Sequence, residues 1–94
     1  MSHMITVDDV RLNKVKFQPE RLKQVLGINL MSLNTLCYDL NLNIKYMTEI
    51  LEGRKTDIKL QVVFAIANYL YVRWQFFYTP KPNLIIRNLT ACLH

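Results

Sequence analysis

The feature that most constrains this chain is an interruption, Leu40-Asn41-Leu42-Asn43, between two short segments of helical periodicity. Apolar residues recur at helical spacing on both sides of it, which indicates two amphipathic helices. These apolar positions are Leu33, Leu36, Leu40, Met47, Ile50 and Leu51. We therefore predict helices over residues 32–40 and 43–52, joined by a tight turn that holds the second helix out on a rigid platform.

Residue types at the boundaries of these two helices agree with the prediction. Ser32 and Asn43 are good N-caps, because their side-chain oxygens accept hydrogen bonds from the first backbone N–H groups of a helix. Asn41 adopts the left-handed backbone conformation more readily than most residues other than glycine. Gly53 ends the second helix. Cys37 is expected to be a small buried side chain.

Three further helices are predicted, over residues 19–28, 58–70 and 73–78. The first of them begins with a proline, which suits a first turn because its missing N–H needs no partner there. Thr56 or Asp57 is expected to cap helix 58–70, and apolar residues around that helix predict that it is covered nearly all round. The side chains expected to face the core are Leu22, Val25, Leu26, Leu60, Val63, Phe64, Ala67, Leu70, Trp74 and Phe77.

The predicted fold class is therefore all-α, a compact five-helix domain over residues 19–78. An N-terminal arm, residues 1–18, precedes it; its first three residues resemble a cloning remnant, and the rest alternates weakly, as an extended segment with room for a short strand does. Residues 79–94 form an apolar tail, expected to serve dimerisation or to begin a further region.

Charge and composition narrow the possible functions. Twelve Lys and Arg against seven Asp and Glu give a net charge of +5, which suits nucleic acid but also an ordinary soluble domain. Residues 11–23 hold five bases and one acid. Hydrophobic residues make up 51%, and this surplus favours self-association. The longest apolar run, residues 62–72, is shorter than the roughly 20 residues that cross a bilayer, so we expect a cytoplasmic protein without a membrane span.

The motif resembles the helix-turn-helix of phage Cro/repressor-type (XRE family) DNA-binding domains. The positions that match it are Ser32, Leu36, Cys37, Leu40, Asn41, Leu42, Asn43, Met47, Ile50 and Gly53. The stretch IANYLYV is also similar to the fourth-helix pattern I-A-x-A-L-x-V of that family. The resemblance covers residues 19–78 and implies a Cro/repressor-like fold.

A narrower likeness concerns the flanking segments. FQPERLKQ, WQFFYTPKP and IIRNLTACLH resemble the surroundings of XRE domains that precede an ImmA/IrrE-type metallopeptidase domain. No HExxH zinc signature is present in the sequence, so peptidase chemistry does not transfer. We expect no enzyme activity, no catalytic residue, no metal and no cofactor.

The resemblance implies a sequence-specific regulator that binds double-stranded DNA, a phage- or mobile-element-type repressor with helix 43–52 in the major groove. It also implies a homodimer that binds two half-sites, and we expect the dimer contact on helices 58–70 and 73–78 and the tail. Lys45 would donate to guanine O6 and N7, and Thr48 would contact a base or a thymine methyl. The expected DNA-contacting residues are Ser32, Leu33, Asn34, Asn43, Ile44, Lys45, Tyr46, Thr48, Glu49, Arg54, Lys55 and Lys59.

Three positions depart from the family pattern and keep an alternative open. Leu33 and Ile44 stand where members often have polar residues, and Glu52 stands where a phosphate would approach. The alternative is a protein–protein interaction module, anti-repressor or antitoxin-like, that docks a regulatory partner on Leu33 and Ile44.

Overall fold

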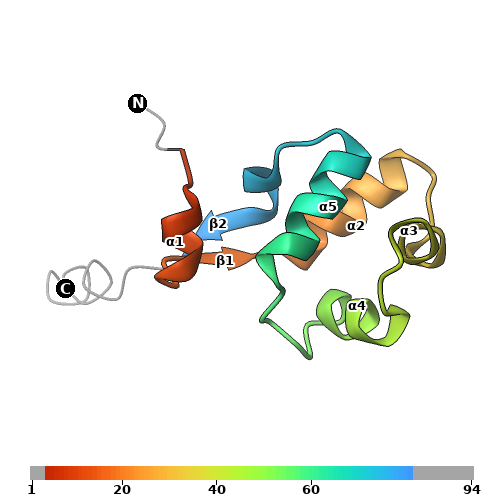
Figure 1. Cartoon of the computed structure of the whole chain (residues 1–94), viewed down its shortest axis with the longest axis horizontal. Coiled ribbons are helices and arrows are strands. Elements are labelled where there is room, and N and C mark those ends of the chain that lie inside the picture. The colour runs from red at the N-terminus through yellow and green to blue at the C-terminus, as the bar shows by residue number, and fades with distance from the viewer. Residues whose placement is uncertain (1–3, 82–94) are drawn as a thin grey trace, which may run out of the picture.

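Helices make up most of this structure, and a small two-stranded sheet joins the two ends of the described chain. The computed structural model describes residues 4–81. In chain order the elements are α1 (Val7–Arg11), β1 (Val15–Phe17), α2 (Pro19–Ile28), α3 (Leu33–Leu40), α4 (Ile44–Leu51), α5 (Leu60–Leu70), the 3-10 helix η1 (Trp74–Phe77) and β2 (Tyr78–Pro80) (Figure 1). Within these described residues, no helix is both long and apolar enough to span a membrane.

The predicted helices are confirmed with small changes at their ends. The segments 19–28, 32–40, 43–52 and 58–70 correspond to α2, α3, α4 and α5. In place of the α-helix predicted over 73–78, residues 74–77 form the short 3-10 helix η1 and Tyr78 begins β2. Side chains that are at least 98% buried fill the space between them: Phe77, Leu22, Leu36, Met47, Ile50, Ile66 and Val63. Such side chains stabilise a fold by about 2–5 kcal/mol each relative to alanine.

Three predictions for α5 are wrong. Phe64 was expected in the core, yet its side chain lies 39% exposed and packs edge-on against Trp74, with 5.4 Å between ring centroids. Gln61 and Asn68 on the same helix are exposed as well, so α5 is not covered all round. The helix is capped by neither Thr56 nor Asp57, because Lys59 occupies the N-cap position and no side chain bonds to the first turn.

The sheet corrects the purely all-α prediction. β1 and β2 pair antiparallel, with Lys16 opposite Thr79 and Phe17 opposite Tyr78. Val15 and Phe17 are buried while Lys16 between them is exposed, as the alternation of a strand requires. Tyr78 was expected in a helix and residues 79–80 in the tail, but together they form β2 and bring the C-terminal part of the described chain back to the N-terminal arm.

The arm also contains a helical turn that was not predicted. Thr6 Oγ1 accepts from the Asp9 N–H at 3.2 Å, and the Thr6 N–H donates to Asp9 Oδ2 at 2.9 Å. This reciprocal capping box starts α1, with aspartate in the position where glutamate or glutamine is usual. The arm therefore contains a helix that was not predicted, followed by β1, the short strand for which the sequence left room.

The Tyr78 hydroxyl has an unusual environment on β2. The side chain is 4% exposed, and the hydroxyl is buried without a hydrogen-bond partner among the described residues. Burial, and then the nearby Tyr46 and Asp57, raise the pKa of Tyr78 to about 12 from an ordinary value of 10.0. The folded chain therefore favours the neutral phenol at this site.

This burial predicts a pH dependence of stability. Below pH 10 Tyr78 is protonated in both the folded and the unfolded chain, but between pH 10 and 12 only the unfolded chain loses the proton, so stability falls as pH rises. Between pH 9 and 11 the free energy of unfolding, measured by urea denaturation, should fall in both proteins. The fall should be about 1 kcal/mol smaller in Tyr78→Phe than in the wild type. At pH 7 the variant should be at least as stable, because the removed hydroxyl has no partner. Equal losses at high pH in both proteins would contradict this account.

Candidate nucleic-acid interface

The turn between α3 and α4 consists of three residues, and side chains cap both helices. Ser32 Oγ accepts from the Thr35 N–H at 3.1 Å at the start of α3. Asn43 Oδ1 accepts from the Tyr46 N–H at 3.0 Å at the start of α4. Between them Asn41 is left-handed, with φ 55° and ψ 46°. The predicted caps and turn are confirmed, so this part of the backbone is determined by local interactions.

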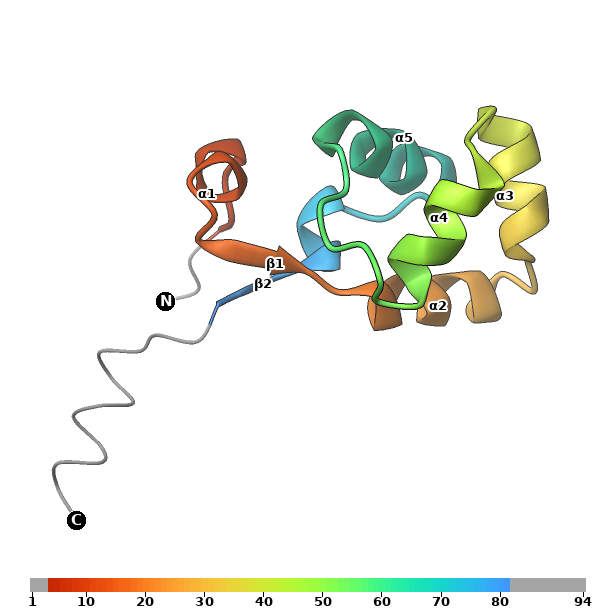
Figure 2. The same cartoon turned by 90° about the horizontal axis from the view of Figure 1, so that it is seen from below.

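Each of the two helices has a buried face and an open face. Leu36 and Cys37 of α3 and Met47 and Ile50 of α4 are buried in the common core. On the open side, Asn34, Asn43, Ile44 and Lys45 are exposed, whereas Leu33, Tyr46, Thr48 and Glu49 are half-buried. Figure 2 shows α4 on the face of the domain that is seen from below. The structure therefore brings most of the expected contact residues to one surface, but Leu33 packs against the core.

Tyr46 has a structural role that the sequence did not indicate. Its hydroxyl accepts from the Lys59 N–H at 3.1 Å and donates to the Asp57 C=O at 3.4 Å. These bonds tie α4 to the segment that leads into α5. The Lys55 ammonium lies 5.4 Å from the centroid of the Tyr46 ring, so the ring also makes a cation–π contact with the loop after α4.

Backbone hydrogen bonds fix the start of the loop after α4, and one of its cations is held in an ion pair. Gly53, with φ 79°, ends the helix, and the Glu49 C=O accepts from the N–H groups of Arg54 and Lys55. The Arg54 guanidinium pairs with the Glu52 carboxylate at 2.6 Å, and both side chains are more than half exposed. The pair partly neutralises a cation that was expected to hold a phosphate.

The charge of the whole motif is balanced. Residues 32–59 contain four bases and four acids, so their net charge is zero, whereas residues 11–23 have a net charge of +4. Any long-range attraction of a polyanion must therefore come mainly from residues outside the two helices.

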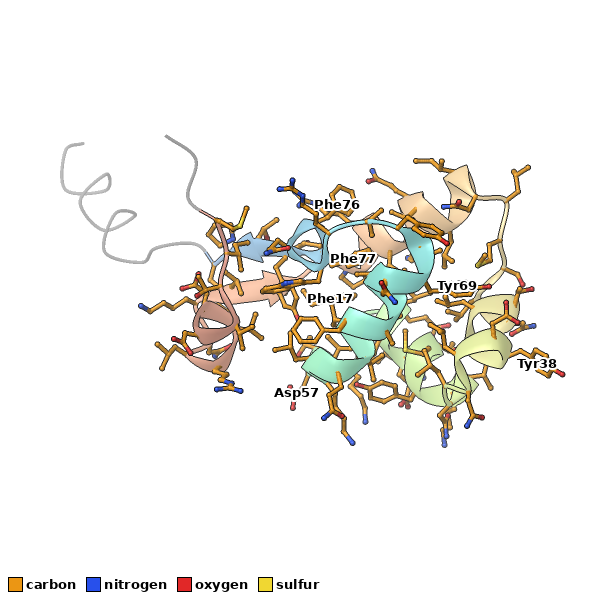
Figure 3. The ribbon with its side chains drawn as sticks, turned by 45° about the horizontal axis from the view of Figure 1, so that its top comes forward. Phe17, Tyr38, Asp57, Tyr69, Phe76 and Phe77 are labelled. Atoms are coloured by element: carbon orange, nitrogen blue, oxygen red, sulfur yellow. The ribbon has the colours of Figure 1, made fainter. Side chains whose placement is uncertain are left out.

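A shallow groove of about 420 Å³ runs along the outer side of the turn. It is lined by Asn34, Cys37, Tyr38, Asn41, Leu42 and Ile44. Tyr38 is 87% exposed and points away from the domain in Figure 3, and Ile44 is 43% exposed. Burial raises the pKa of the Cys37 thiol, which disfavours the thiolate form.

A tertiary hydrogen bond also joins α3 to α5. The Tyr69 hydroxyl of α5 donates to the Asp39 carboxylate of α3, and this hydrogen bond is the main cause of the raised pKa of Tyr69. Tyr69 is labelled in Figure 3. Together with the Tyr46 bonds, this contact links α5 to both helices of the motif.

Comparison with known proteins finds no match: no family model, curated protein or solved structure is significantly similar to the chain.

The Tyr46 hydrogen bonds generate a test of the motif's rigidity. Tyr46→Phe removes only the hydroxyl, and we expect the free energy of unfolding to fall by about 1 kcal/mol, because the Lys59 N–H and the Asp57 C=O lose a partner. Urea denaturation measures the change. Tyr71→Phe is the matched control, since the Tyr71 side chain is 95% exposed and should tolerate the loss of its hydroxyl. Equal stability of Tyr46→Phe and wild type would show that the hydroxyl contributes nothing.

Proposed function

We propose that this chain is a sequence-specific regulator that binds double-stranded DNA, built on a Cro/repressor-type (XRE family) fold with α4 as its recognition helix. The observation that supports it best is the pair α3–α4. Two side-chain-capped helices meet at a three-residue turn in which Asn41 is left-handed. The N-cap Asn43 and the first residues of α4, Ile44 and Lys45, are exposed, while Met47 and Ile50 are buried.

The dimensions of α4 suit a DNA groove. An α-helix with its side chains is about 10–12 Å across, and the major groove of B-DNA is about 12 Å wide. The N-terminal residues of α4 would meet the base edges, as in other helix-turn-helix proteins. Lys45 then donates to guanine O6 and N7, and Ile44 and Thr48 contact thymine methyl groups.

Backbone contacts position the helix in this proposal. The N-terminus of α3, at Ser32 and Asn34, offers N–H groups to a phosphate. Lys55 and Lys59 lie in or beside the loop after α4 and are exposed. Arg54 would first have to leave Glu52 in order to bind a phosphate.

A homodimer is part of the proposal, because one recognition helix contacts too few bases for tight specific binding. Two aromatic side chains support a contact on the side of α5 and η1: Phe64 is 39% and Phe76 40% exposed. The tail, which was also expected at this contact, lies outside the described residues. Such a regulator acts in the cytoplasm, where it meets its DNA.

Selection from a random double-stranded DNA pool tests the proposal. Purified protein should retain a sequence motif, as an inverted repeat with half-sites about ten base pairs apart. Lys45→Ala should then lose about 1–3 kcal/mol of discrimination at particular positions of that motif. Lys23→Ala is the matched control, since Lys23 is paired with Glu20 on α2 and should leave the motif unchanged. A retained pool that stays random even at low salt would refute DNA-sequence recognition.

One observation favours the alternative, a protein-interaction module that docks a regulatory partner. The groove beside the turn combines exposed Tyr38 and Ile44 with a motif of zero net charge, which suits an apolar partner better than a phosphate backbone. In that case the pool stays random, and binding of the partner is abolished by Ile44→Asp.

A further inference from the structure

Three lysines gather on one face of the two-stranded sheet. The Lys81 N–H donates to the Lys14 C=O at 3.0 Å, so the antiparallel pairing extends one residue beyond β1 and β2 and sets these two lysines opposite each other. Side chains alternate along a strand, so Lys14 and Lys16 lie on the face opposite to buried Val15 and Phe17. All three lysines are exposed. We call Lys14, Lys16 and Lys81 the lysine ribbon.

The lysine ribbon differs in its hydrogen-bond partners from other cations of the domain. The acceptor near it is neutral, since Lys81 Nζ donates to Asn13 Oδ1 at 2.6 Å. By contrast, Lys23 and Arg54 each have a carboxylate partner. Like charges placed opposite each other on a sheet are destabilising, so the free protein maintains a repulsion that a bound polyanion would relieve.

The sheet that carries the lysine ribbon lies next to the loop after α4. Lys16 and Lys81 border a hollow of about 480 Å³, whose lining also includes Val15, Phe17 and Tyr78 of the sheet and Thr56, Asp57 and Ile58 of the segment that leads into α5. Figures 1 and 2 both show the loop between α4 and β1, so that α4, the loop and the sheet follow one another along the domain. A duplex that holds α4 in its groove would extend past the sheet.

We propose that the lysine ribbon binds the DNA phosphate backbone beside the groove that α4 occupies. This inference rests on the proposed function and adds a second contact surface to it. It explains how a motif with no net charge could bind a polyanion: the neutral helices would select the sequence, and the ribbon would supply the electrostatic attraction. Each phosphate contact contributes about 0.9 to the slope of log affinity against log salt.

The test compares two double variants that remove the same charge. Lys14→Gln/Lys16→Gln and the control Lys23→Gln/Arg73→Gln each lower the net charge from +5 to +3, since each removes two cations. Binding of a fluorescein-labelled mixed-sequence duplex is followed by anisotropy between roughly 50 and 200 mM salt. The ribbon variant should lower the salt slope by about 1.8, twice the value of one contact, and the control should leave the slope unchanged. Lys81→Gln, on the other strand, should lower it by about 0.9.

The outcomes separate this inference from the proposed function. If the wild type binds the duplex but the ribbon variant keeps its slope, or both double variants lose slope equally, the ribbon proposal is overturned and DNA binding stands. If the wild type does not bind the duplex at the lowest salt, both proposals fall. Urea denaturation excludes misfolding as a cause: the ribbon variants should be at least as stable as the wild type, because they relieve the repulsion between Lys14 and Lys81.

Discussion

The left-handed backbone at Asn41 is the constraint on which the motif depends. It ends α3 and lets the Leu42 N–H donate to the Cys37 C=O at 2.8 Å. The chain then turns within three residues, and Leu36 and Met47, both fully buried, enter the same core. A residue that resists this conformation would separate the two buried faces. The orientation of α4 is thus set by one backbone conformation and the apolar burial on either side of it.

A second set of interactions fixes the opposite end of the domain. The Gln18 N–H donates to the Phe77 C=O at 2.7 Å, and Gln18 Nε2 donates to Thr79 Oγ1 at the same distance. The Arg21 guanidinium bonds to the Phe76 C=O at 2.8 Å. Phe17 packs against Phe77, with 6.0 Å between ring centroids. These contacts join the start of α2 to η1 and β2, so the sheet is a rigid extension of the helical core.

The features that could be predicted from the sequence are those that depend on interactions between residues close together in the chain. The caps at Ser32 and Asn43 and the turn at Asn41 follow from side-chain chemistry within a few residues, and α2 to α5 follow from apolar periodicity. The pairing of β1 with β2 joins segments more than sixty residues apart, as Gln18 and Thr79 illustrate, and no local pattern contains it. Phe64 was misplaced because helical spacing alone did not distinguish the core side of α5 from the side beside Trp74.

In the candidate site, too, some features could be predicted from the local sequence and others depend on tertiary contacts. Exposure of Asn43, Ile44 and Lys45 follows from the helical pattern, whereas the inward packing of Leu33 and the Tyr46 bonds depend on neighbouring elements. The signal for α1 was present, since threonine and aspartate stand three residues apart at Thr6 and Asp9, but it differs from the usual capping box. The opposed lysines became visible only with the sheet register.

The central claim is that α4 enters a DNA groove, and amide chemical shifts recorded by NMR during titration with duplex DNA test it most directly. The account predicts that the largest shifts fall on the start of α3, the N-terminal half of α4 and the loop after it. It would be contradicted if these amides stay unshifted at saturating duplex, or if the shifts are confined to α5 and η1.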